Sequence, residues 1–94
     1  MYAIMFNLDV ETLKLTYPNE FVDDAYIFIE RFLSSKGFDR QQGNLYFGDD
    51  TVDAVKATMT VHALSRRYPW FKASVSDIRM LRIEDNDDLK PALM

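Results

Sequence analysis

Residues 38–47 read FDRQQGNLYF, two short extended segments with Gly43 between them, near the centre of a 94-residue chain. A glycine between two such segments is typical of a β-hairpin, because glycine readily adopts the backbone angles of a tight turn. The stretch therefore predicts two antiparallel strands joined around Gln42 and Gly43.

Two helical segments are expected before this hairpin. In residues 21–33 apolar side chains recur every three or four positions, with Asn19 as the expected N-cap and Gly37 as the C-terminal stop. A shorter helix of about two turns is expected within residues 9–17, because Pro18 disfavours helical geometry in the residue before it.

A helix and a strand are expected after the hairpin. The stretch that follows Asp50 has an apolar stripe at helical spacing, with Asp53 in its first turn, and Pro69 ends it. Residues 2–8, YAIMFNL, and residues 75–83, VSDIRMLRI, predict the two remaining strands.

The resulting order is strand, helix, strand, strand, helix, strand, which is that of the split βαβ or ferredoxin-like unit, an α+β fold. We predict a single domain, residues 1–94, in which both main helices lie on one face of a four-stranded antiparallel sheet. Residues 84–94 contain Leu89, Ala92 and Leu93 and are too apolar for a frayed tail. We expect this segment to extend the sheet or to cross to a second subunit as an added strand.

The composition excludes several classes of protein. The chain has no cysteine, which removes disulfides, thiolate metal sites and cysteine nucleophiles and is compatible with a reducing cytosol. Its formal net charge is -4, so any contact with nucleic acid must be local. No apolar run approaches the roughly 18 residues of a membrane helix, and the N-terminus lacks the basic region of a signal peptide. We therefore expect a cytoplasmic protein with no membrane partner.

The sheet face turned away from the helices is expected to be apolar. In the first strand, Ala3, Met5 and Asn7 should lie on this open face, while the alternate residues lie beneath the helices. We expect Tyr46, Ile78 and Met80 to join the open face. A soluble monomer rarely exposes such a patch, so the pattern predicts a face-to-face homodimer.

Four polar residues are expected to converge at the end of the first strand: Asn7, Gln42, Asn44 and Ser76. A two-fold axis through the open face would bring two such clusters together in a shallow cleft floored by Met5 and Tyr46. The cluster contains no strong acid, base or nucleophile and so indicates a binding site. From its residue type alone, Asn7 is better interpreted as a residue that bonds backbone at the strand end.

Three further groups favour structural interpretations. His62, the only histidine, has no recognisable carboxylate partner, so we expect it on a helix surface. The acidic residues of 84–88 lack the spacing of a calcium loop, which favours a solvated turn. The cations Arg66, Arg67 and Lys72 lie among the aromatic side chains of Tyr68, Trp70 and Phe71. They could bind phosphate, but aromatic residues after a helix-ending proline more often anchor a turn to the core.

Three separated motifs occur together in this chain: MYAIMFNLD at the start, QQGNLYFGD at the hairpin, and WF before SVSDIRMLRIED. With a helix that ends in GF they cover nearly the whole chain. This pattern resembles virulence-associated protein D, a bacterial family related to the CRISPR-associated adaptation endonucleases of ferredoxin-like fold. The resemblance implies a homodimeric, toxin-like endoribonuclease, with a small antitoxin as partner in some members. It also implies a catalytic aspartate at the end of the first strand.

That aspartate maps onto Asn7. Asparagine keeps the size of the side chain, but it cannot act as a general base and is a poorer ligand for Mg²⁺ than a carboxylate. Asn44 stands where the resemblance implies serine, and Ser76 where it implies a basic residue. Asp9 is a substitute acid only if a residue beyond the strand end can reach the site. We therefore expect a weak or inactive chain, and favour an engineered inactive variant over a natural member that has lost or relocated its activity.

Two chemical routes and two rival functions stay open. Mg²⁺ could be held by paired carboxylates at position 7 of the two subunits, or the ribose 2′-hydroxyl could attack without a metal, which needs a base that this chain does not display. The main rival function is a non-catalytic dimeric interaction protein, resembling the CRISPR integration scaffold. A small-molecule sensor is disfavoured, because residues 8–11 contain no glycine-rich turn.

Overall fold

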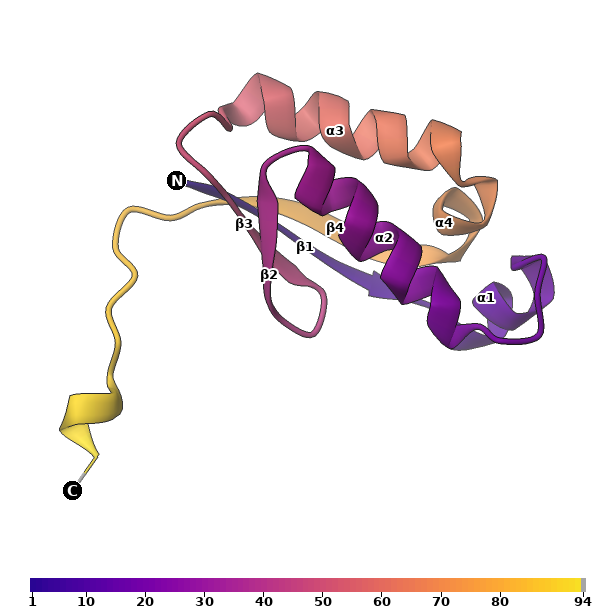
Figure 1. Ribbon diagram of the computed structural model, residues 1–94, viewed down its shortest axis with the longest axis horizontal. Helices are drawn as coiled ribbons and strands as arrows, with labels where there is room; N and C mark the ends of the chain where they lie inside the picture. Colours follow the sequence, from indigo (N-terminus) through magenta and orange to yellow (C-terminus); the bar gives the residue numbers. More distant parts are fainter. Residues whose placement is uncertain (94) are drawn as a thin grey trace.

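The computed structural model describes residues 1–93 (Figure 1). In its sheet, β1 lies between two neighbouring strands and is antiparallel to both. The strand order is β2-β3-β1-β4, which confirms the predicted antiparallel sheet and the α+β fold. The strands are β1 (Tyr2–Leu8), β2 (Phe38–Gln42), β3 (Leu45–Gly48) and β4 (Val75–Arg82). The helices are α1 (Val10–Thr16), α2 (Asp23–Ser35), α3 (Ala54–Arg67) and α4 (Pro69–Ser74), followed by a 3-10 turn, η1 (Lys90–Ala92).

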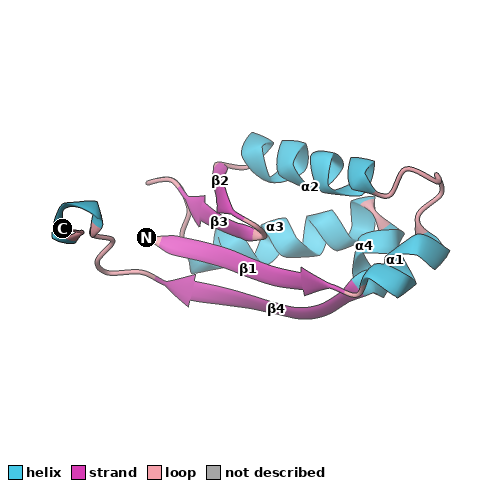
Figure 2. Ribbon diagram, turned by 90° about the horizontal axis from the view of Figure 1, so that it is seen from below, coloured by secondary structure: helices cyan, strands magenta, loops and turns pink. Residues whose placement is uncertain are grey.

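The two long helices cover the same face of the sheet. Figure 2 shows α2 and α3 above β1 and β4, with no helix below these strands. The buried residues of α2 are Ala25, Ile29 and Leu33, spaced by four, and they pack in one core with Ile4 and Phe6 of β1. This arrangement is the predicted one, and it leaves the opposite face of the sheet open.

The boundaries of α2 differ from the sequence expectation at its first turn. Its N-cap is Val22, without a side-chain cap, and the Asn19 carboxamide oxygen instead accepts a hydrogen bond from the backbone N–H of Phe21 at 3.0 Å. Asn19 therefore makes a turn before the helix, and its prediction as N-cap was wrong. Gly37 follows the helix with a φ of 92°, a conformation that favours glycine and confirms the predicted stop.

Pro69 ends α3 as predicted, but it also begins a further helix that the sequence pattern did not indicate. Proline is compatible with the first turn of a helix, where its missing N–H has no intrahelical partner. α4 carries Trp70 and Phe71 into the core, where the ring of Trp70 meets that of Tyr17 edge to face at 5.0 Å. These two aromatic residues therefore anchor the turn, which confirms the structural interpretation.

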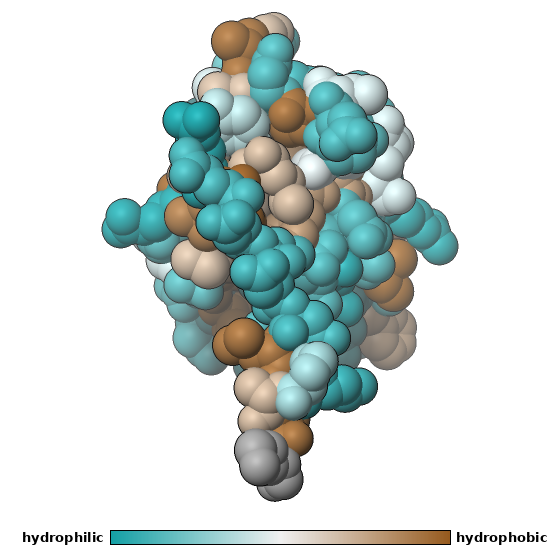
Figure 3. All heavy atoms as spheres, turned by 90° about the vertical axis from the view of Figure 1, so that its left-hand side faces the viewer, coloured by the Kyte–Doolittle hydropathy of each residue, from teal (hydrophilic) through white to brown (hydrophobic). Residues whose placement is uncertain are grey.

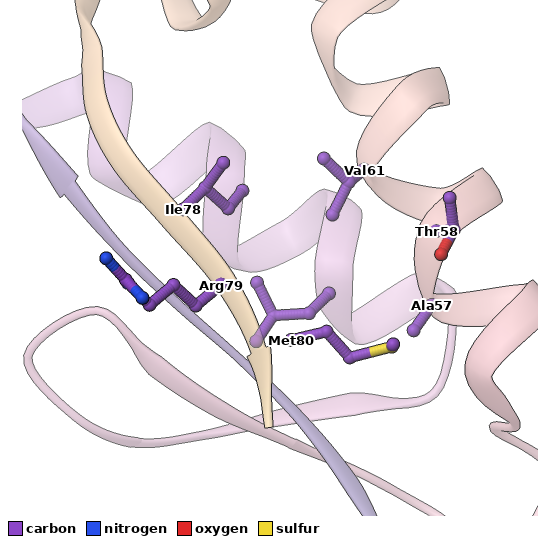
Figure 4. Close-up of a pocket in the computed structure, with 7 residues that line it drawn as sticks. Ala57, Thr58, Val61, Ile78, Arg79 and Met80 are labelled. Carbon is purple, nitrogen blue, oxygen red and sulfur yellow. The ribbon is translucent and has the colours of Figure 1, made fainter. Parts of the chain in front are cut away.

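Tyr46, Ile78 and Met80 lie on the helix-covered face, so their prediction on the open face was wrong. Residues directly opposite each other in antiparallel strands share a face, and the register pairs both Tyr46 and Met80 with Ile4. Figure 4 shows Ile78 and Met80 together with Val61 in a groove between β4 and α3.

The open face still carries apolar side chains, but they are different ones. Its centre is formed by Ala3, Met5, Leu45, Phe47 and Leu81, here called the open-face patch. Met5 is 38% exposed, whereas Ala3 is fully buried between Phe47 and Leu81, its partners on the two neighbouring strands. An apolar strip flanked by polar residues thus lies along the uncovered side of the sheet.

The segment after β4 leaves the body of the domain as an arm (Figure 3). Within residues 83–93 it forms no strand, so the prediction that it extends the sheet of its own chain was wrong; Met94 lies outside the described residues. Leu89 and Leu93 are 73% and 80% exposed on this arm. Its crossing to a second subunit stays a prediction. Among the described helices none is long and apolar enough to span a membrane.

Candidate functional site

Asn7 is the last open-face residue of β1, and its side chain is exposed. The register places it opposite Asp77 of β4. Immediately after this pair the two strands slip, because Leu8 pairs with Val75 and leaves Ser76 without a partner. Position 7 therefore lies at a bulge where regular strand pairing ends.

The β2–β3 hairpin approaches the same strand end. Gly43 forms its turn with a φ of 52°, and the backbone carbonyl of Asn44 accepts a hydrogen bond from the N–H of Phe6 at 3.2 Å. A shallow hollow of about 440 Å³ results, lined by Met5, Phe6, Asn7, Gln42, Gly43, Asn44 and Leu45. The structure thus brings three of the four predicted polar residues together.

Ser76 does not line this hollow. Its hydroxyl donates to the backbone carbonyl of Asn7 at 3.2 Å, across the bulge. This contact joins β4 to the end of β1 at the bulge and engages the Ser76 hydroxyl with backbone.

Tyr46 was expected in the site but lies beneath the helices, with only 2% of its surface exposed. Its ring stacks on Phe6 at a centroid distance of 6.1 Å. Burial and, to a smaller extent, the carboxylate of Glu30 raise the pKa of its hydroxyl to about 12, with Arg40 partly opposing them. Met5, and not Tyr46, is the apolar side chain beside Asn7.

The two carboxylates nearest to Asn7 in structure or sequence both have other partners. Asp77 accepts a hydrogen bond from the Arg79 guanidinium at 3.1 Å. Asp9 caps α1, where it accepts from the Glu11 N–H at 3.2 Å and from the Thr12 hydroxyl at 2.7 Å. Asp9 is therefore committed to the helix. Asp77 was missed from the sequence, because only the register of β4 places it opposite Asn7.

The residues around Asn7 do not fit a magnesium site within one chain. Magnesium favours carboxylate oxygens, and Asn7 offers a single neutral amide oxygen beside a carboxylate already paired with Arg79. Across residues 1–93, no three histidine, aspartate or glutamate side chains are grouped to hold a metal ion. What this cluster offers within one subunit is hydrogen bonding, from the amides of Asn7, Gln42 and Asn44.

The chain is similar to several curated proteins over almost its full length, although no family model matches it. An endoribonuclease VapD 2 of Riemerella anatipestifer is 44% identical, and the match covers 99% of both chains. An endoribonuclease VapD homolog of Helicobacter pylori is 43% identical over 99% of this chain and 96% of its own. An endoribonuclease VapD of Dichelobacter nodosus is 36% identical over 94% and 91%.

Proposed function

The chain belongs to the virulence-associated protein D (VapD) family, and on that premise we propose that its parent activity is the endonucleolytic cleavage of RNA in the hollow around position 7. Nearly full-length similarity to relatives that are named endoribonucleases carries the proposal. The position of Asn7 supports it further, because an exposed strand end at a bulge is open to a substrate as large as RNA.

A carboxylate at position 7 would supply the group that the hollow lacks. It would accept the proton of an attacking oxygen, from the ribose 2′-hydroxyl or from water, as that oxygen bonds to phosphorus. The 5′-oxygen of the next nucleotide would leave and take a proton from solvent. Asn7, Gln42 and Asn44 can donate hydrogen bonds to phosphate, but the amide of Asn7 accepts no proton near neutral pH. We therefore propose that this chain binds RNA and cleaves it weakly or not at all.

We also propose that the active unit is a homodimer joined through the open-face patch. Pairing two copies would cover Met5 and the half-buried Leu45, Phe47 and Leu81. With a two-fold axis that runs along β1, it would also bring the two hollows together, since Asn7 shares a face with the patch and lies at one end of the strand. A cytoplasmic, toxin-like role with a small antitoxin belongs to the same proposal.

The direct test replaces Asn7 by aspartate and incubates both proteins with the same single-stranded RNA. We expect cleavage by Asn7→Asp to exceed that by the parent at least about 100-fold, the scale of one regained general base. Asn86→Asp is the matched control, because it adds the same charge on the exposed arm. Parallel reactions with Mg²⁺ and with EDTA determine whether the regained activity needs a metal.

A non-catalytic binding function is the second candidate. The observation that favours it is that Asp9 and Asp77, the acids nearest to Asn7, are already held by other groups. RNA that is bound by both proteins and cleaved by neither would establish this function and overturn the nuclease proposal.

A further inference from the structure

A second hollow lies where α3 meets α4. It has a volume of about 470 Å³ and is lined by His62, Ser65, Arg66, Pro69 and Lys72. No carboxylate is among these residues, although acidic residues outnumber basic ones in the whole chain, 15 to 11. The hollow is therefore a local concentration of positive charge on an acidic protein.

The cations of this hollow are free to bind a ligand. Within residues 1–93 the ion pairs involve Lys14, Arg79 and Arg82, and neither Arg66 nor Lys72 takes part in one. Both side chains are exposed. The Ser65 hydroxyl donates to the His62 carbonyl at 2.7 Å, so its hydrogen is already used within α3. Binding at this hollow would come from the cationic groups.

Compensation of the α3 dipole explains only part of the cluster. A cation in the last turn of a helix interacts favourably with its exposed carbonyl groups, and Arg66 stands in that turn. Lys72 stands in the last turn of the next helix, α4, so it can interact with the carbonyl groups of that six-residue helix but has no such function for α3. Lys72 and Arg66 line the same hollow because the chain turns at Pro69 between their helices. Trp70 holds this turn by packing into the core.

The chemistry of the hollow indicates phosphate and not a nucleobase. No tryptophan, tyrosine or phenylalanine ring lines the hollow for a base to stack on, since Trp70 and Phe71 are buried, and its one aromatic ring is the imidazole of His62. The guanidinium of Arg66 and the ammonium of Lys72 are both typical ligands of phosphate oxygens.

The hollow lies at the same end of the fold as position 7. α4 leads directly into β4, and the carbonyl of Ser74, two residues after Lys72, accepts a hydrogen bond from the N–H of Asp9 at 2.7 Å. Asp9 in turn follows Asn7 by two residues. Figure 1 shows α4 near the end of β1. Asn7 faces the open side of the sheet whereas α3 lies on the covered side, so a strand of RNA would pass around this end of the fold to contact both sites.

We propose that the hollow between α3 and α4 binds a backbone phosphate of the RNA that flanks the segment held at position 7. This inference rests on the proposed function for the identity of the ligand. The hollow carries sequence-independent affinity, whereas the groups around position 7 face the nucleotides to be cleaved.

The test measures the affinity of the parent chain for a fluorescent single-stranded RNA over a range of salt concentrations. We expect the double variant Arg66→Gln with Lys72→Gln to weaken binding at least about fivefold. The slope of log Kd against log salt should fall by about 0.7, since one phosphate contact on a single strand contributes about that much. Arg31→Gln with Lys36→Gln is the matched control, because it removes one exposed cation from α2 and one from the residue after it, and neither residue lines either hollow.

Equal losses of affinity and slope in the two double variants would overturn the proposal, provided that both melt like the parent. The proposal would also be overturned if Arg66→Gln with Lys72→Gln left RNA affinity unchanged but altered self-association, measured by sedimentation. That result would assign the hollow to the acidic segment 84–88 of a second copy. Cleavage by Asn7→Asp tests the nuclease proposal separately: its failure, together with a specific loss of RNA affinity in the hollow variant, would leave this site standing.

Discussion

Phe6 and Asn7 are neighbours in β1, yet their side chains lie in opposite environments. Phe6 is 1% exposed beneath the helices, stacked on Tyr46 and in edge-to-face contact with Phe71 at 5.4 Å. Asn7 is exposed on the uncovered face, beside Asp77 and the hairpin turn. One strand therefore contributes to the core through one face and to the candidate site through the other.

The difference shows how a chain of 94 residues can offer a candidate site without a deep cavity. The covered face supplies the buried apolar surface that stabilises the fold, so its residues tolerate little change. The open face can vary in charge at position 7 because it contributes little to that core. Changes on the two faces should therefore affect different measurements.

The largest expected effect on stability is at the covered face. Phe6→Ala removes a fully buried ring that packs against Tyr46 of β3 and Phe71 of α4. The substitution should lower the free energy of unfolding by about 3–5 kcal/mol. Met5→Ala, one residue away on the open face, should cost less than about 1.5 kcal/mol in dilute protein. Urea unfolding of both variants checks this, and similar losses would contradict the division between the faces.

Tyr46 provides a pH test of the covered face. Because the folded-state pKa is raised to about 12 from 10, its contribution to stability is fully present below pH 10 and is lost as pH rises toward 12. A shift of about two units corresponds to at most about 2.7 kcal/mol. Tyr46→Phe has no hydroxyl to ionise, so its free energy of unfolding should fall less between pH 9 and pH 12 than that of the parent. A parallel pH dependence in both proteins would show that Tyr46 does not titrate in this way.

The open-face patch predicts an effect on assembly. Met5→Lys places a charge in the proposed seam, opposite Arg79, and should raise the dimer dissociation constant at least about tenfold. Met59→Lys is the matched control, because Met59 is exposed on α3, away from this face. Sedimentation that finds the same association for both variants would exclude the patch as the dimer interface.

The smallest effect concerns the pH dependence of a restored site. In the Asn7→Asp background, the charge of Asp77 on the adjacent strand should raise the pKa of the introduced carboxylate. Adding Asp77→Asn removes that repulsion and frees Arg79 to pair with the new acid. The rising limb of the pH–rate profile should move to lower pH by about half a unit or more. A shift to higher pH would mean that Asp77 acts on the site in another way.

Much of the fold could be predicted because local signals agreed with it. The glycine at the hairpin, the helical spacing of apolar residues and the apolar run of β1 all pointed to one order of elements, and they also placed Asn7 correctly on the open face. The short helix at Pro69 was missed, because a proline that ends one helix can also begin the next.

The errors arose where the answer depended on strand register. A shift of one residue moves every side chain of a strand to the other face, and no local pattern distinguished the two registers of β3 and β4. Tyr46 was therefore assigned to the site, while Asp77 opposite Asn7 was overlooked. The bulge at Ser76 depends on the same pairing between segments far apart in sequence.

The central claim is that position 7 controls chemistry without supporting the fold. The most direct measurement compares RNA cleavage and thermal melting of the parent and Asn7→Asp under identical conditions. The account predicts a gain in cleavage of at least about 100-fold with little change in melting temperature and a slightly weaker dimer, as two like charges approach across the axis. Equal cleavage by the two proteins across pH, with and without Mg²⁺, would contradict it.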